Sequence, residues 1–153
     1  MERLEHIIAA HPLFAGLRPE YARLIGGCAH NTRFESGQFL LQHGAPADEF
    51  YLLRHGRVAL ALGAPGRGTL TVQTLGPGEL LGVSWLVAPY RWMYDAQALE
   101  PLGALAIDAA CLRTKSAADH DLGFELAQRF MAVLVRRLHA ARLQLLDVYG
   151  AHR

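Results

Sequence analysis

The chain has 153 residues, of which 52% are hydrophobic and 19% charged, with a formal net charge of +1. This length predicts one domain over residues 1–153, and the composition excludes a disordered chain. Positive charge is not gathered into the basic stripe that nucleic-acid binding needs. No apolar run reaches the roughly 20 residues that cross a bilayer, and the N-terminus lacks the apolar stretch of a signal peptide. We therefore expect a cytoplasmic protein that contacts neither nucleic acid nor membrane directly.

The first thirty residues (1–30) are predicted to be helical. An apolar face that begins at Leu4 indicates a short helix, and Pro12 would interrupt it because proline has no N–H group to donate. Pro19 suits the first turn of a second helix, which is expected to run to about Ala29.

Residues 32–107 alternate short apolar stretches with closely spaced glycines, a pattern typical of strands joined by tight turns. The connections are too short for crossover helices, so the strands should pair antiparallel. The predicted fold class is mainly β with flanking helices, namely an antiparallel β-roll or jelly roll (a double-stranded β-helix) followed by a long C-terminal helix. The expected strands are Phe39–Gln42, Glu49–Arg54, Arg57–Leu62, Thr69–Leu75, Tyr94–Leu99 and Gly103–Ile107.

Residues 119–149 are predicted to form that long helix. A second apolar set, Leu126, Phe130 and Val133, would face the β-roll, beside a seam with heptad spacing. A helix that is apolar on two faces is hard to bury in one small domain, so we expect a homodimer in which the seam contacts its mate. The alternative is that the seam folds back on its own roll. The seam consists of Ala127, Met131, Leu134, Leu138, Ala141, Leu145 and Val148.

Residues that would carry catalysis or bind a metal do not form a recognisable pattern. The sequence has no nucleophile elbow, phosphate-binding loop or HExxH motif, so no catalytic residue and no enzymatic activity are expected. The eight histidines show no ligand spacing, so neither a metal nor haem is expected. Cys28 and Cys111 are interpreted as small core residues, because two distant cysteines suggest neither a disulfide framework nor a zinc site.

A pattern of glycines and small residues marks the segment Phe34–Val58. Its spacing resembles the front half of the cyclic nucleotide-binding domain found in catabolite activator protein, its oxygen-sensing relatives and kinase regulatory subunits. The resemblance also covers the turn at 11–17, the segment 75–82 and the long C-terminal helix, and it implies a regulatory β-roll. The matching positions are Gly37, Gly44, Ala47, Asp48, Phe50, Tyr51, Gly56 and Val58.

In the transcription factors of this family a winged helix-turn-helix follows the long helix. This chain ends at Arg153, so the resemblance leads us to expect a stand-alone module without a DNA-binding domain. Such a module would act on a partner protein.

The resemblance places a phosphate-binding cassette in this chain near residues 82–96. In the family, a loop and a short helix cradle the cyclic phosphate, since backbone N–H groups at a helix N-terminus favour an anion. Gly82 matches the glycine that opens the cassette, and Ala96 matches the small residue near its end.

Two ligand positions of the family are replaced. The ribose-binding glutamate falls on Val83 and the phosphate-binding arginine falls on Tyr94, with Asp95 where the family has Ser or Thr. On the long helix, Ala141 and Arg142 stand where the activator protein offers hydroxyls to the base. The usual contacts with cyclic AMP are therefore largely absent.

The first interpretation of these replacements is a re-tooled pocket. Backbone N–H groups and the Ser84 hydroxyl would bind a cyclic nucleotide (cAMP or cGMP) or another anionic effector, Arg91 would replace the missing arginine, and aromatic rings would stack on the ligand. The protein would then be a sensor whose cassette moves against the long helix. The candidate ligand-binding residues are Gly82, Val83, Ser84, Trp85, Arg91, Tyr94, Asp95, Ala96 and Arg142.

The second interpretation is a filled pocket. Trp85 or Trp92 would occupy the space of the nucleotide, Arg91 would pair with Glu79 or Asp95, and the domain would serve protein interaction or dimerisation. In either case Glu79 is predicted to be a turn or surface residue. Residual binding of cyclic AMP through a different alignment of the cassette is a third possibility.

Overall fold

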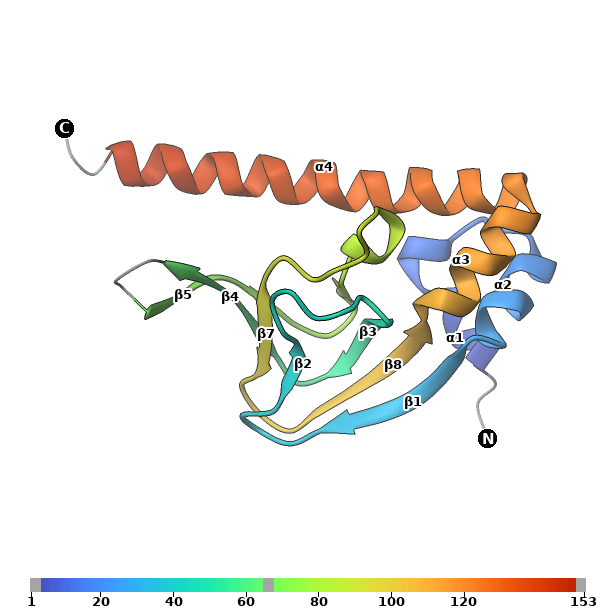
Figure 1. Cartoon of the computed structure of the whole chain (residues 1–153), viewed down its shortest axis with the longest axis horizontal. Coiled ribbons are helices and arrows are strands. Elements are labelled where there is room, and N and C mark those ends of the chain that lie inside the picture. Colours follow the sequence, from blue (N-terminus) through green and yellow to red (C-terminus); the bar gives the residue numbers. More distant parts are fainter. Residues whose placement is uncertain (1–3, 65–67, 151–153) are drawn as a thin grey trace.

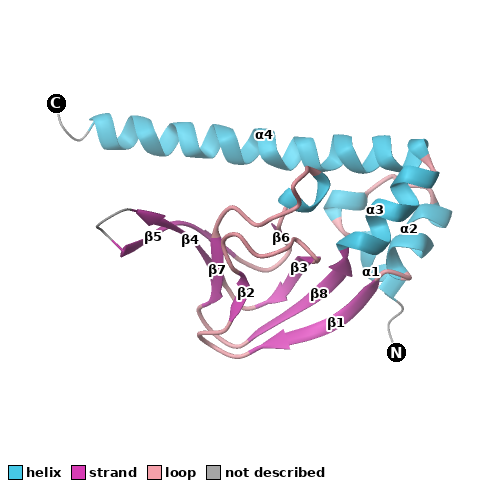
Figure 2. Ribbon diagram, in the orientation of Figure 1, coloured by secondary structure: helices cyan, strands magenta, loops and turns pink. Residues whose placement is uncertain are grey.

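The computed structural model describes residues 4–64 and 68–150, which form a β-roll flanked by helices (Figures 1 and 2). Two antiparallel four-stranded sheets, ordered β1-β8-β3-β6 and β2-β7-β4-β5, make up the roll. The predicted fold class is thus confirmed. The strands are β1 (Ala29–Phe34), β2 (Phe39–Leu41), β3 (Glu49–His55), β4 (Val58–Ala64), β5 (Gly68–Leu75), β6 (Leu80–Leu81), β7 (Asp95–Ala98) and β8 (Leu102–Asp108).

The helices lie at one end of the roll and along one side of it (Figure 1). Three short ones precede the strands: α1 (Leu4–Ala10), the 3-10 helix η1 (Pro12–Phe14) and α2 (Pro19–Gly26). Another 3-10 helix, η2 (Ser84–Leu86), interrupts the strands, and α3 (Ala109–Ala118) and α4 (His120–Gly150) follow them. The break at Pro12 and the helix start at Pro19 are as predicted.

The core lies between the two sheets and under the first half of α4. Apolar side chains of both sheets line it, among them Leu52 of β3 and Leu60 of β4. Strand β8 lies between β1 and β3 and is nearly continuously buried. Phe50, Trp85 and Phe130 are among the largest fully buried side chains, and they come from a strand, a loop helix and α4.

The structure corrects one predicted boundary and adds a helix that the sequence analysis did not contain. Strand β1 occupies Ala29–Phe34, part of which the sequence assigned to the end of a helix, because these residues pair antiparallel with β8 from Ala29↔Ile107 to Phe34↔Leu102. This long-range pairing outweighs the local pattern. Helix α3 was not predicted either. It begins because the Asp108 carboxylate caps it, accepting from the Cys111 N–H at 2.9 Å.

The prediction that the two cysteines are unbonded is wrong. Cys28 and Cys111 form a disulfide whose Cα atoms lie 6.0 Å apart. The pairing of β1 with β8 brings them together, since the Asp108 N–H donates to the Cys28 carbonyl at 2.8 Å. Their separation of 83 residues hid this proximity from a local reading of the sequence.

Helix α4 is the longest element, with 31 residues and a length of about 46 Å at 1.5 Å per residue. Its buried residues are Leu122, Leu126, Phe130 and Val133, which confirms the predicted face toward the roll. Toward its C-terminal end it runs above β4 and β5 in Figure 1, and beyond Val133 it has no buried residue. None of the helices in the described part of the chain is long and apolar enough to cross a membrane. The predicted seam residues Ala127, Met131, Leu134, Leu138, Ala141, Leu145 and Val148 are all exposed.

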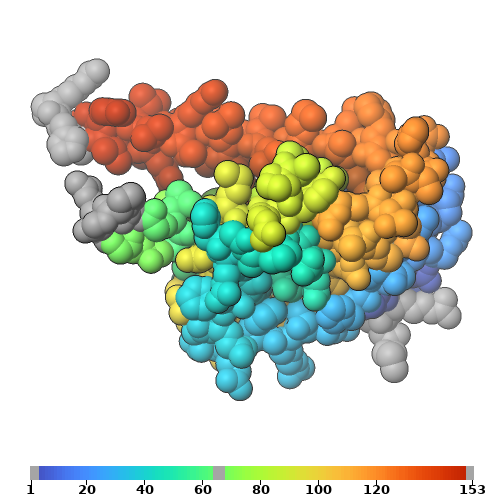
Figure 3. Space-filling model, in the orientation of Figure 1, coloured from blue at the N-terminus to red at the C-terminus, as the bar shows by residue number. Residues whose placement is uncertain are grey.

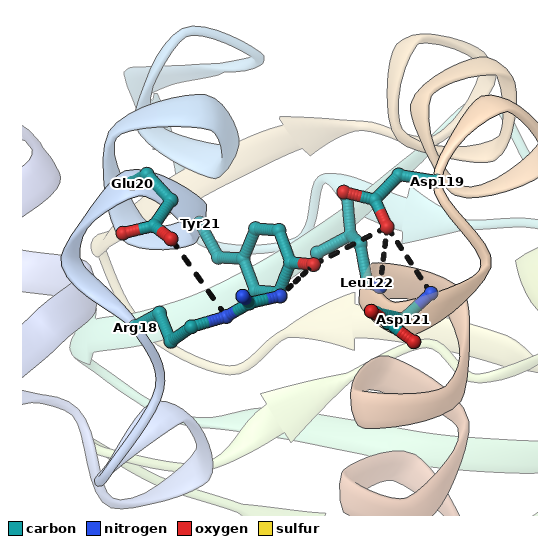
Figure 4. A network of polar contacts seen from close by, with 6 residues as sticks. All are labelled: Arg18, Glu20, Tyr21, Asp119, Asp121 and Leu122. Carbon is teal, nitrogen blue, oxygen red and sulfur yellow. Dashed lines mark hydrogen bonds and ion pairs between the residues drawn. The ribbon is translucent and has the colours of Figure 1, made fainter.

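The start of α4 is held by a polar network centred on Asp119 (Figure 4). The Asp119 carboxylate accepts from the N–H groups of Asp121 and Leu122 at 3.1 and 3.3 Å, as a capping residue does. It also accepts from the Tyr21 hydroxyl of α2 at 3.2 Å, and the Arg18 guanidinium donates to the same hydroxyl and lies 4.2 Å from the ring centroid. The network therefore connects α2 to the start of α4, the helix that carries the seam.

Stability at low pH should depend on Asp119. The Leu122 N–H, with smaller contributions from Tyr21, Asp121 and Arg18, holds the pKa of this carboxyl below its ordinary value of 3.8. A lowered folded-state pKa means that the stabilisation is complete above the unfolded-state pKa and is lost as pH falls through the folded-state value. Urea unfolding between pH 2 and 6 should show a shallower pH dependence in Asp119→Asn than in the wild type. Asp147→Asn, at the exposed end of α4, is the matched control, and equal slopes for wild type and Asp119→Asn would contradict this assignment.

Candidate functional site

The segment 82–96 folds as a loop between the two sheets and α4. Strand β6 leads into it, η2 lies near its start, and its last residues begin β7. In the space-filling view its yellow-green residues fill the space between α4 and the cyan segment of β2 and β3 (Figure 3). The segment therefore packs against both the roll and α4.

Trp85 is the centre of the segment and has no exposed surface. Its ring stacks on Phe50 of β3, with centroids 4.7 Å apart and an interplanar angle of 10°. The Phe130 ring of α4 meets Trp85 edge-on at 5.2 Å and Phe50 at 5.4 Å. These are the offset-stacked and T-shaped geometries that aromatic rings prefer. The cluster joins sheet, loop and long helix through one apolar contact.

Arg113 of α3 holds the same loop from its backbone side. Its guanidinium donates to the Trp85 carbonyl at 2.8 Å and to the Ala47 carbonyl at 3.4 Å. The same group lies 4.4 Å from the ring centroid of Tyr90, a cation–π distance. Tyr90 has a positive φ of 58°, which a non-glycine residue seldom adopts. Arg113 thus connects α3 to the loop at both Trp85 and Tyr90.

Two further aromatic residues, Trp92 and Tyr94, lie against Gly82, the first residue of the segment. Gly82 has φ +104°, and a Cβ there would lie 2.8 Å from the Trp92 ring, so only glycine fits without movement of the ring. Trp92 is itself buried. The Gly82 N–H is directed to the Tyr94 hydroxyl, and burial raises the pKa of Tyr94 although this N–H and the nearby Arg137 oppose the rise. The Tyr94 hydroxyl thus lies beside one of the backbone N–H groups that the first interpretation assigned to an anion.

Arg137 of α4 was not selected from the sequence. It donates to the Leu80 carbonyl, and burial lowers its pKa, opposed by nearby Tyr94 and Glu79. Helix periodicity could have found it, because it lies four residues after the buried Val133 and seven after Phe130. Arg113 had no such signal, since neither its helix nor its long-range contacts were visible in the local pattern.

A cavity of about 600 Å³ lies beneath α4, on the side of the turn at His11. Glu79 and three arginines line it, together with apolar and backbone groups. Two of those arginines already donate to backbone carbonyls: Arg129 to Leu13 and Ala15, and Arg137 to Leu80. Arg136 is the exposed member of the set.

Arg91 and Asp95 face the turn between β2 and β3. The Arg91 guanidinium donates to the Gly44 carbonyl at 2.8 Å, and the Asp95 carboxylate accepts from the His43 N–H at 2.7 Å. Neither Glu79 nor Asp95 pairs with Arg91. The two residues fasten the loop to the neighbouring turn.

The remaining predicted site residues do not converge. Glu79 accepts from the Gly76 N–H at 2.6 Å and closes a turn, as predicted. Ala96 is buried within β7, between β2 and β4. Arg142 lies on the exposed distal half of α4. Val83 and Ser84 are partly exposed at the start of η2. Among the described residues, no group of three or more His, Cys, Asp or Glu is placed to hold a metal ion.

The family profile described as the cyclic nucleotide-binding domain matches residues 31–119. The chain belongs to the cyclic nucleotide-binding domain family. The match covers the strands of the roll, the replaced cassette and α3, and it confirms the family that the residues Phe34–Val58 indicated.

Relatives of this domain include two curated bacterial regulators. A CRP-like cAMP-activated global transcriptional regulator of Mycobacterium tuberculosis is 23% identical over 95% of this chain and 63% of its own length. The cyclic AMP receptor protein of Thermus thermophilus is 30% identical over 88% of this chain and 60% of its own. The chain thus spans about three fifths of the length of these relatives.

A solved structure gives the same fold. A candidate cyclic nucleotide-binding protein from Geobacter metallireducens superimposes with a TM-score of 0.80 and 29% identity, covering 91% of this chain and 100% of that one. This cyclic nucleotide-binding domain therefore keeps the family scaffold, while its cassette is built around Trp85, Trp92 and Tyr94.

Proposed function

We propose that this chain is a regulatory domain whose cassette is held in a docked position by its own side chains, so that it signals through protein contacts rather than through cyclic nucleotide. The observation that carries the proposal is Trp85, fully buried between Phe50 and Phe130. It links the loop to α4, as a bound ligand would have to do. The proposal adopts the filled-pocket interpretation. It includes no catalytic role and places the protein in the cytoplasm.

The contacts around the cassette support this. Arg113 binds the loop backbone, and the Gly82 N–H meets the Tyr94 hydroxyl. Val83 and Tyr94 stand in the positions of the family's glutamate and arginine, so the two charged partners of a cyclic nucleotide are missing from those positions. A ligand would have to displace buried rings, and burial of such a ring contributes about 1.5–3 kcal/mol.

The surface through which the domain would act is the exposed seam of α4. Seven seam residues with heptad spacing are solvent-exposed, and Leu138 at the middle is 52% exposed. A second copy of the chain fits such a seam, because helices with a heptad repeat pack on each other. We therefore propose a homodimer formed through α4, which presents the docked cassettes to a partner protein.

A second candidate function is retained on one observation, the cavity beneath α4. Its lining includes the exposed Arg136, the partly buried Arg137 and His11. An anionic effector bound there would contact α4 directly without entering the cassette. This candidate keeps the sensor role but moves it to a different site.

Calorimetric titration separates these functions. With cyclic AMP, cyclic GMP or a cyclic dinucleotide, we expect no saturable heat at ligand concentrations up to about 100 μM, where a weak site of micromolar Kd would be nearly saturated. Micromolar binding that Tyr94→Phe changes and Arg136→Gln does not would contradict the filled cassette. Binding that Arg136→Gln abolishes and Tyr94→Phe leaves intact would favour the cavity beneath α4.

A further inference from the structure

The disulfide lies between the segment that precedes β1 and the first turn of α3. Cys28 is buried and bonded to Cys111, which is partly exposed. Backbone hydrogen bonds surround the pair: the Asp108 N–H donates to the Cys28 carbonyl, and the Ala109 N–H donates to the Asp48 carbonyl, both at 2.8 Å. The covalent bond is thus one of several ties at this end of α3.

We propose that Cys28 and Cys111 form a reversible thiol-redox site that controls how firmly α3 holds the cassette. The effect of this site on the cassette rests on the proposed function. The exchange chemistry of the two sulfurs does not depend on how the cassette is used.

The path from the disulfide to the cassette is short. Cys111 and Arg113 are two residues apart on α3. Arg113 donates to the Trp85 carbonyl at 2.8 Å and lies 4.4 Å from the Tyr90 ring centroid. When the bond is closed, it limits the movement of the helix that carries this guanidinium. When the bond is open, α3 keeps only non-covalent ties to the roll, and the Arg113 contacts should open more often.

The chemistry is thiol–disulfide exchange with a small thiol such as glutathione. Its thiolate attacks one sulfur and forms a mixed disulfide, and the other cysteine leaves as a thiolate that takes up a proton. A second small thiol then attacks the mixed bond. The result is two protein thiols and one oxidised small-thiol dimer, and the reverse steps restore the protein bond. The partly exposed Cys111 is the accessible point of attack, whereas Cys28 is buried.

A cytoplasmic location makes reversibility meaningful, because disulfides in that compartment are mainly transient. After reduction, the hydrogen bond from Asp108 to the Cys28 carbonyl keeps the two chain segments adjacent. The sulfurs therefore stay near each other and can re-form the bond when oxidised small thiol accumulates.

The test uses the full chain in two states, one treated with oxidised glutathione and one with dithiothreitol. Alkylation in denaturant followed by mass spectrometry counts free thiols, and we expect none in the first state and two in the second. Hydrogen exchange of the amides of Ala47, Val87 and Tyr90, which bond within and across the cassette, should be several-fold faster in the reduced state. Free thiols that persist with the oxidant, or equal exchange in both states, would overturn the proposal.

Three variants sharpen the result. Cys28→Ser combined with Cys111→Ser should show the fast exchange in both states. Arg113→Gln should exchange fast in both, because the link to the cassette is missing. Lys115→Gln, on the same helix, should respond like the wild type; if it and Arg113→Gln both kept the full response, the path through Arg113 would be wrong. Nucleotide binding to the cassette would refute the proposed function while leaving the thiol count unchanged.

Discussion

Trp85→Ala should lower the free energy of unfolding by about 3–5 kcal/mol, the range for truncating a large buried aromatic side chain. The ring has no exposed surface and contacts both Phe50 and Phe130, so its removal leaves a cavity at the junction of sheet, loop and α4. Urea unfolding followed by circular dichroism measures the change.

Two control variants make this result specific. Trp85→Phe keeps a ring against Phe50 and removes the indole Nε1, which is buried without a hydrogen-bond partner, and an unpaired buried donor costs about 1–3 kcal/mol. It should therefore destabilise much less than Trp85→Ala. Val87→Ala, in the same loop but exposed, should change stability by less than about 0.5 kcal/mol. A loss below 1 kcal/mol for Trp85→Ala would show that the loop is not held by this ring.

Leu138→Asp should convert the proposed dimer into a monomer. Leu138 is exposed at the middle of the α4 seam, and in a dimer the new carboxylate would be buried without a partner, which is strongly unfavourable. Sedimentation velocity at micromolar concentration should give a dimer for the wild type and a monomer for the variant.

The matched control for this substitution is His139→Asp. His139 is also exposed, but one residue along a helix points about 100° away, so the same charge falls outside the seam and the dimer should persist. A monomeric wild type at these concentrations, or dimers of both variants, would refute an interface through Leu138.

The fold could be read from the sequence where its signals are local. Glycine-separated apolar stretches predicted most strands, and the two-faced periodicity of residues 119–149 predicted α4 and its buried side at Phe130 and Val133. Elements that depend on distant partners were missed. Strand β1 exists through its pairing with β8, and the bond between Cys28 and Cys111 closes across the same pairing.

The candidate site was predictable in position but not in arrangement. Its altered residues could be located from Gly82 and Ala96, yet the sequence left open whether Trp85 lines a pocket or fills it. That question depends on how tightly Phe50 and Phe130 approach from β3 and α4, and no local pattern reports such distances. Arg113 was overlooked for the same reason, since its acceptors are backbone carbonyls elsewhere in the chain.

The distal half of α4 carries a consequence for how this domain behaves at different abundances. From Leu134 to Gly150 the described helix has no buried residue, and an isolated helix of this size is only marginally stable in water. In the proposed dimer the mate would cover its apolar side, so ordering of this segment and dimerisation would form a single equilibrium governed by mass action. At low protein concentration this segment would fray, and at high concentration dimerisation would keep it helical.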